Sequence, residues 1–291
     1  MLRIERMNTA SSSFEVQDRQ YLWHDCDPGH DDALALAMAT AGEDMFNIKL
    51  LGVSTVGGNV TVDKCTINAR KILYLAKHDN LDCYTGASQP FVRPCRNAEF
   101  IHGECGLGGT TTLAGINLPP QGEKFGDGSA IEAMYKAFMS TPKGSSWLVC
   151  TGPLTNAALL LMTYEEEIAE HLAGICFMGG AVTGGNCNSG NEFNMFGDPE
   201  SAKIVIETWG EKLNKLVMVP LDVTETAVTS RKQRERMSKI QGTLPLTISQ
   251  LWEKSRFMTA ADQPDDPKLQ FDGDVCAVIH DPCAIMYVWL P

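Results

Sequence analysis

The sequence predicts an α/β fold in which an open, mostly parallel sheet is covered by helices on both faces. Short apolar segments rich in strand-forming residues alternate with longer amphipathic segments, an order typical of parallel α/β proteins. The strand-like segments are almost continuously apolar, as expected of strands that are buried on both sides. The chain has 291 residues, 44% of them hydrophobic, which is enough to bury a large core. We expect residues 1–20 to form a loose tail and residues 21–291 a single domain.

The predicted elements follow one another in strict alternation. β-Branched and aromatic residues favour strands at 21–25, 48–56, 82–86, 146–152, 172–180 and 215–222. Helical periodicity favours helices at 31–41, 61–78, 129–141, 153–163, 198–209, 246–258 and 281–290. The helix at 153–163 begins with Pro153, a favoured residue in the first helical turn. The Pro/Asp-rich stretch at 260–274 is expected to be an exposed loop.

Charge and cysteine content limit the partners and the location of the protein. The net charge is 24 − 36 = −12, which disfavours binding to nucleic acid or to an anionic membrane. There is no run of 18 apolar residues, so a membrane-spanning helix is not expected. The first 20 residues lack the apolar core of a signal peptide. We therefore expect a cytoplasmic protein whose ten cysteines, none in a CxxC pair, are reduced and mostly buried.

Polar or glycine-rich groups follow most of the predicted strands. They are Asp25-Cys26-Asp27, Gly57-Gly58-Asn59, Thr151-Gly152, Met178-Gly179-Gly180 and Asp222. Ligands of open parallel sheets bind beyond the carboxyl ends of the strands, so these groups are expected to line one crevice. Ordinary turn chemistry explains the glycines, but it does not explain four aspartates within residues 25–32.

The acidic segment YLWHDCDPGHDDALALA indicates a site for a hard cation. Asp25 and Asp27 alternate at a strand end, and Asp31 and Asp32 open a helix, where carboxylates can cap free N–H groups. A simple capped turn needs only one such residue. Four neighbouring carboxylates repel one another unless a cation lies among them. Oxygen ligands without nearby Cys or His pairs suit Ca²⁺, Mg²⁺ or Mn²⁺, and the spacing does not fit an EF-hand.

Three further segments carry candidate site residues. His280 and Asp281 precede the last predicted helix, where Asp281 can act as a cap and His280 as a proton donor. Glu192 and Asn194 are two residues apart, so an extended backbone would direct both toward vicinal sugar hydroxyls. His102 lies in a glycine-flanked loop suited to a mobile lid.

Seven motifs in this order resemble the inosine–uridine preferring nucleoside hydrolases. They are DCDPGHDD, STVGGN, HGECG, CTGPLTNAA, FMGG, NEFNMFGDPE and IHDPCA. The similarity runs from about residue 21 to the C-terminus. It implies a Rossmann-like nucleoside hydrolase fold, a tightly held Ca²⁺, and hydrolysis of purine and/or pyrimidine ribonucleosides to free base and ribose, as in nucleoside catabolism and salvage. It also suggests a homodimer or homotetramer.

The resemblance implies a role for each matching residue. The calcium ligands would be Asp27, Asp32, the Thr151 backbone carbonyl and Asp281. Asp27 would also be the general base for a calcium-bound water, His280 would protonate the leaving base, and Asp25 would support the metal site. The groups that would contact the nucleoside are Asp31, Asn59, His102, Met178, Glu192, Asn194 and Asp281.

Two alternatives and one departure accompany this interpretation. The chain ends about one helix after IHDPCA, whereas family members usually continue, so C-terminal elements are expected to be missing. A truncated, inactive relative that only binds nucleosides is therefore one alternative. The other is an aspartyl-phosphate type phosphatase, which also has DxD after a first strand. These phosphatases favour Thr or Val two residues after the second Asp, where this chain has Gly29.

Overall fold

The central sheet has six strands, all parallel, as the sequence predicts. In the computed structural model, which describes residues 19–114, 116, 128–187, 190–262 and 275–290, the strand order is β3-β2-β1-β4-β5-β6. The strands are β1 (Gln20–Cys26), β2 (Ile48–Thr55), β3 (Cys83–Thr85), β4 (Ser146–Cys150), β5 (Leu172–Met178) and β6 (Leu216–Val219). Gln20 already pairs with Ile48, so the sheet begins one residue before the predicted domain. The rest of the predicted tail, 1–18, lies outside the described residues.

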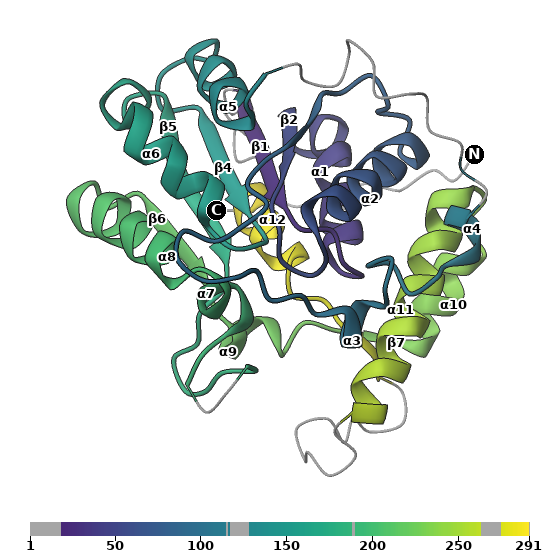
Figure 1. The fold of residues 1–291 in the computed structure, drawn as a ribbon. Coiled ribbons are helices and arrows are strands. Elements are labelled where there is room, and N and C mark those ends of the chain that lie inside the picture. The colour runs from purple at the N-terminus through teal and green to yellow at the C-terminus, as the bar shows by residue number, and fades with distance from the viewer. Residues whose placement is uncertain (1–18, 115, 117–127, 188–189, 263–274, 291) are drawn as a thin grey trace, which may run out of the picture.

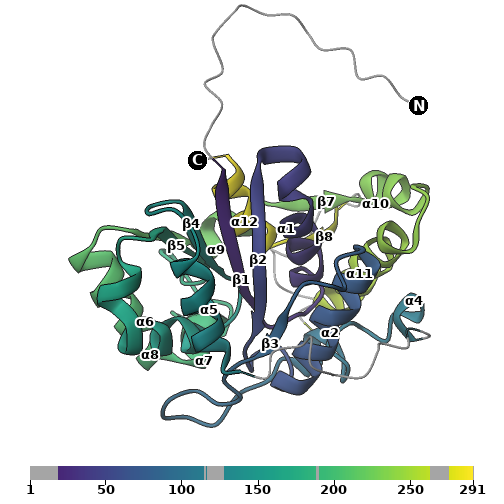
Figure 2. The same ribbon diagram turned by 90° about the horizontal axis from the view of Figure 1, so that it is seen from above.

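Helices cover both faces of the sheet (Figures 1 and 2). One face carries α1 (Asp32–Phe46), α2 (Val62–Leu75) and α12 (Pro282–Trp289), and the other carries α5 (Ala130–Met139), α6 (Thr155–Ile168) and α8 (Pro199–Val205). Each side has its own buried apolar layer, with Leu36 and Ile285 on the first face and Phe138 and Leu160 on the second. The predicted helices on both faces are thus confirmed.

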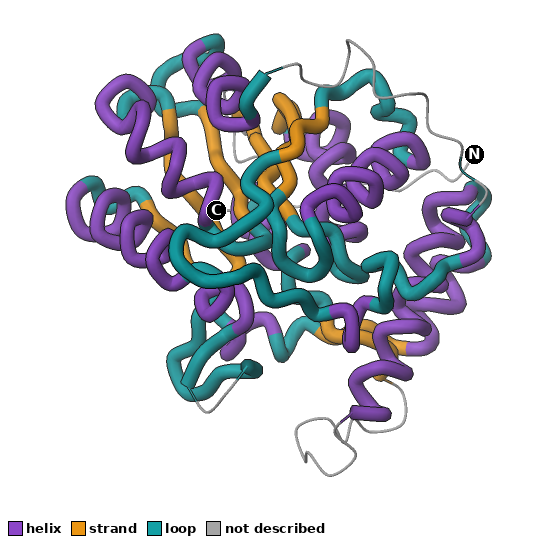
Figure 3. Tube along the Cα trace, viewed as in Figure 1, coloured by secondary structure: helices purple, strands orange, loops and turns teal. Residues whose placement is uncertain are grey.

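Several short elements were not predicted. They are α3 (Glu99–His102), α4 (Thr111–Ala114), α7 (Phe193–Gly197), α9 (Leu221–Thr224), β7 (Val228–Ser230), α10 (Arg231–Ser238) and β8 (Val275–Val278). The predicted helix at 198–209 is present as α8 and the π-helical turn η1 (Ile206–Lys212), which follows it directly. β7 and β8 form a separate antiparallel pair. Most of these elements are too short to give a periodic signal. Figure 3 shows the helices, strands and loops of the domain in the view of Figure 1.

The long helix α11 (Thr243–Asp262) extends the predicted helix at both ends. Residues 260–262 therefore belong to this helix and not to the predicted loop, and the rest of that loop, 263–274, lies outside the described residues. None of the helices in the described part of the chain has the length and apolar character needed to cross a membrane.

The strand order has its topological reversal point between β1 and β4, the position of the predicted crevice. From these two neighbouring strands the chain continues outward in opposite directions, through β2 and β3 on one side and β5 and β6 on the other. Such a reversal point is where open α/β sheets bind their ligands. Asp27 follows β1 and Thr151 follows β4, so the predicted site residues lie at this point.

Candidate active site

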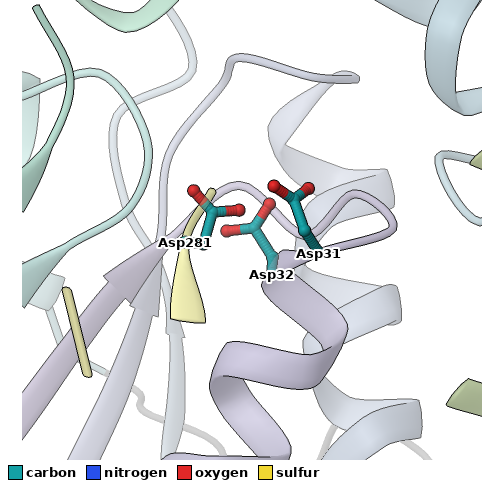
Figure 4. Close-up of side chains that lie close together, drawn as sticks. All are labelled: Asp31, Asp32 and Asp281. Atoms are coloured by element: carbon teal, nitrogen blue, oxygen red, sulfur yellow. The ribbon is translucent and has the colours of Figure 1, made fainter. Parts of the chain in front are cut away.

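Three carboxylates from two distant segments meet at this crevice. One oxygen each of Asp31, Asp32 and Asp281 lie within 4.8 Å of one another. Figure 4 shows the carboxyls of Asp32 and Asp281 directed toward each other, with Asp31 beside them. The backbone N–H of His280 donates to Asp31 Oδ2 at 3.1 Å and so joins segments 249 residues apart. The two motifs that sequence analysis treated separately form one cluster.

The predicted capping role of these aspartates is wrong. Asp31 and Asp281 are at the N-cap positions of α1 and α12, but neither side chain makes a capping hydrogen bond. The Asp31 side chain instead accepts from His280, and Asp32 Oδ2 accepts from the backbone of Gly29 at 3.0 Å. The carboxylates of Asp31 and Asp281 are therefore not engaged by the ends of their own helices.

Asp27 is fully buried next to this cluster. Its Oδ2 accepts a hydrogen bond from the Asn59 backbone N–H at 2.7 Å, while its Oδ1 has no partner among the described residues. Two glycines leave room for this carboxylate. A Cβ at Gly152 would lie 2.8 Å from Oδ1, and a Cβ at Gly58 would overlap Oδ2. The unpartnered oxygen is unusual for a buried carboxylate and indicates that a ligand is expected there.

The carboxylates interact electrostatically as a group. Burial and then neighbouring carboxylates raise the pKa of Asp27 and Asp281 well above the usual range and that of Asp32 to about 6. Burial also acts to raise the pKa of Asp31, but His280, His102 and hydrogen bonds outweigh it, so the pKa is lowered. None of the ion pairs between described residues includes these side chains. The raised pKa values of three of these groups mean that their ionised forms destabilise one another, a cost that a bound cation would remove.

Two asparagines support the crevice. Asn59 Nδ2 donates to the Asp27 carbonyl at 3.1 Å and to Asp32 Oδ2 at 3.2 Å. Asn194 Nδ2 donates to the carbonyls of Thr151 at 2.8 Å and Met178 at 3.2 Å. In this structure both amides therefore hold the ends of the strands together.

Glu192 and Asn194 do not lie on one extended segment as predicted. Glu192 caps the short helix α7, and its carboxylate accepts from the backbone N–H groups of Gly180, Asn194 and Met195. Asn194 lies within that helix. Both side chains are buried, and burial raises the pKa of Glu192. The alternation rule failed because a capping residue changes the backbone direction at this position.

The two predicted histidines lie near the carboxylate cluster in different environments. His102 ends the short helix α3, where a loop was predicted, and its side chain is buried. Its Nδ1 accepts from the backbone N–H of His30 at 3.2 Å, and the two rings are 5.0 Å apart. Burial lowers the pKa of His102 to about 4. His280 Nδ1 lies 2.8 Å from Thr224 Oγ1.

Asp25, which was expected to support the metal site, is itself held by side chains with no predicted role. Asp25 Oδ1 accepts from Ser54 Oγ and from Asn156 Nδ2, and burial raises the pKa of Asp25 to about 7. His24 Nε2 lies 3.0 Å from Thr151 Oγ1, and burial lowers the pKa of His24 to about 3. A histidine inside an otherwise apolar strand was the available signal for His24.

Known proteins resemble this chain in sequence and in fold. The model of the family described as inosine-uridine preferring nucleoside hydrolase matches residues 22–291. A pyrimidine-specific ribonucleoside hydrolase of Shewanella oneidensis is 36% identical over 92% of this chain and 77% of its own. An inosine-uridine preferring nucleoside hydrolase of Leishmania major is 34% identical over 91% and 77%. The solved purine-preferring ribonucleoside hydrolase of Gardnerella vaginalis superimposes with a TM-score of 0.78, at 25% identity, over 94% of this chain and 80% of its own.

Proposed function

The chain belongs to the inosine-uridine preferring nucleoside hydrolase family, and from this premise we propose that it hydrolyses the N-glycosidic bond of ribonucleosides with a bound Ca²⁺ and Asp27 as general base. The products would be the free base and ribose. The observation that carries the proposal is the buried carboxylate group at the β1–β4 reversal point, which includes an unpartnered oxygen of Asp27. Family membership favours this reaction over the phosphatase alternative.

The residues at the crevice fit a calcium ion. We propose the carboxylates of Asp27, Asp32 and Asp281 and the Thr151 carbonyl as ligands, because hard oxygen donors are those that calcium prefers. Asp31 lies within the same cluster and adds negative charge. A bound calcium ion would hold a water at the crevice and make it more acidic.

Asp27 is proposed to take the proton from the attacking water. Its carboxylate is held by the Asn59 N–H on one oxygen and is free on the other, so the free oxygen can accept a proton. A base must be held within hydrogen-bond distance of the proton it removes. The absence of a Cβ at Gly58 and Gly152 leaves room for the carboxylate in this position.

The nucleoside itself is proposed to lie over the same crevice. Asp31, Asn59, Glu192, Asn194 and Asp281 would hold the ribose hydroxyls, with Met178 beneath the sugar. The transition state of glycoside hydrolysis carries positive charge on the sugar, so nearby carboxylates stabilise it. His280 would protonate the leaving base, and His102 would contact that base.

The decisive experiment measures reducing sugar released from a panel of purine and pyrimidine ribonucleosides. We expect release in the presence of Ca²⁺, and a strong loss in Asp27→Asn. Asp79→Asn is the matched control, because this exposed aspartate lies outside the site. A folded parent protein that releases no sugar from any nucleoside would favour the inactive, nucleoside-binding alternative. Light scattering would test the predicted homodimer or homotetramer.

A further inference from the structure

His24, Thr151 and Asp32 form a buried chain of hydrogen bonds beneath the crevice. His24 Nε2 lies 3.0 Å from Thr151 Oγ1, and Thr151 Oγ1 donates to Asp32 Oδ1 at 2.8 Å. The three residues come from β1, the end of β4 and the start of α1, and each is at most 1% exposed. A buried chain of hydrogen bonds such as this one holds its side chains in one arrangement.

The chemistry of the three groups sets the direction of these bonds. A threonine hydroxyl has one proton. An ionised Asp32 can only accept, so the hydroxyl must give its proton to Asp32 and receive one from His24. His24 is then the tautomer with its proton on Nε2. Its Nδ1, which has no partner among the described residues, is left as an acceptor, which is less costly than a buried N–H without a partner.

The Thr151 hydroxyl connects His24 to two of the proposed calcium ligands. It holds Asp32 Oδ1 directly, while Asp32 Oδ2 is held by Gly29 and Asn59. The carbonyl of the same threonine is the second ligand. Resting on the proposed function, we propose that His24 is a positioning residue, which orients Asp32 and Thr151 for the cation by donating a hydrogen bond to the Thr151 hydroxyl.

Residues that hydrogen-bond to a metal ligand without touching the metal typically contribute about 10–100-fold in metal affinity. We therefore expect His24→Leu, which fills the space without a donor, to weaken calcium binding by at least about tenfold. His24→Gln can place an amide N–H near the position of Nε2 and should restore affinity to within about threefold. His24→Asn places its amide near Nδ1 and should behave like the leucine variant. Purely structural packing would not distinguish glutamine from asparagine in this way.

A chelator first removes bound metal from the parent and from each variant. Ca²⁺ is then titrated into each protein, and the melting temperature and the heat of binding are measured. Long-range ¹⁵N NMR of the metal-free parent reads the His24 tautomer independently of calcium. Thr151→Val removes the hydroxyl but keeps the carbonyl. It should lose as much affinity as His24→Leu, and the double variant should lose no more than either. This second route decides the proposal if His24→Leu does not fold.

The outcomes separate this proposal from the proposed function. A parent that binds no Ca²⁺ refutes the proposed cofactor, while the NMR measurement still tests His24. A parent that binds Ca²⁺ together with a folded His24→Leu of unchanged affinity refutes only the role of His24. A proton on Nδ1 in place of Nε2, or equal losses in the glutamine and asparagine variants, would also overturn it.

Discussion

Replacing Gly152 with alanine should displace the proposed general base. The new Cβ would lie 2.8 Å from Asp27 Oδ1 and 2.8 Å from Val56 Cγ1, whereas ordinary contacts of this kind begin at about 3.4 Å. Asp27 or its surroundings must therefore move by about 0.6 Å. A misplacement of about 1 Å can reduce an enzymatic rate roughly 100-fold, so we expect kcat/KM to fall by about tenfold or more.

The assay measures ribose release at saturating Ca²⁺, expressed per folded molecule. Overpacking costs about 1–3 kcal/mol of stability, so a melting curve must accompany each activity measurement. Gly128→Ala is the matched control, since a Cβ there would meet nothing within 4 Å. A folded Gly152→Ala enzyme with the parental kcat/KM would refute the argument that Asp27 needs this close packing.

Three further predictions concern the base, its support and the core. Asp27→Asn should lower kcat by about 10²–10⁴-fold, the range for loss of general base catalysis, while the protein stays folded; parental turnover in the ribose assay would contradict this. Asn194→Ala removes the amide that holds the carbonyls of Thr151 and Met178 in place. Because the Thr151 carbonyl is a proposed ligand, calcium binding measured by calorimetry should weaken; unchanged affinity would count against it. Phe138→Ala empties a fully buried position and should cost about 3–5 kcal/mol in denaturant unfolding, and a cost below about 1 kcal/mol would disagree with a well-packed core.

Long periodic segments could be predicted from the sequence, and short ones could not. The six strands of the sheet and the helices that cover it were all expected, because each strand is an almost continuous apolar run and each helix has a helical periodicity. The short helices α3 and α7 were missed, since four or five residues give no periodicity. The antiparallel β7–β8 pair was also missed, because its strands are short and far apart in sequence.

The sequence predicted which segments form the site better than it predicted the hydrogen bonds that their side chains make. The acidic turn and the His280–Asp281 segment were recognised from sequence, and the structure brings them together. Their hydrogen bonds were not predictable, because they depend on tertiary contacts: Asp31 bonds to His280 and not to its own helix. Glu192 and Asn194 were predicted to lie on one extended segment, yet Glu192 caps α7 and Asn194 lies within that helix. The role of His24 depends on a threonine 127 positions away, and no local pattern reveals that pairing.

The central claim is that the crowded carboxylates hold one calcium ion. Elemental analysis of the purified protein, followed by chelation and calorimetric titration with Ca²⁺, tests it most directly. We expect one calcium per chain, a lower melting temperature after chelation, and recovery on adding Ca²⁺ that is lost in Asp32→Ala. A folded protein that contains no divalent metal and takes up none would contradict the account.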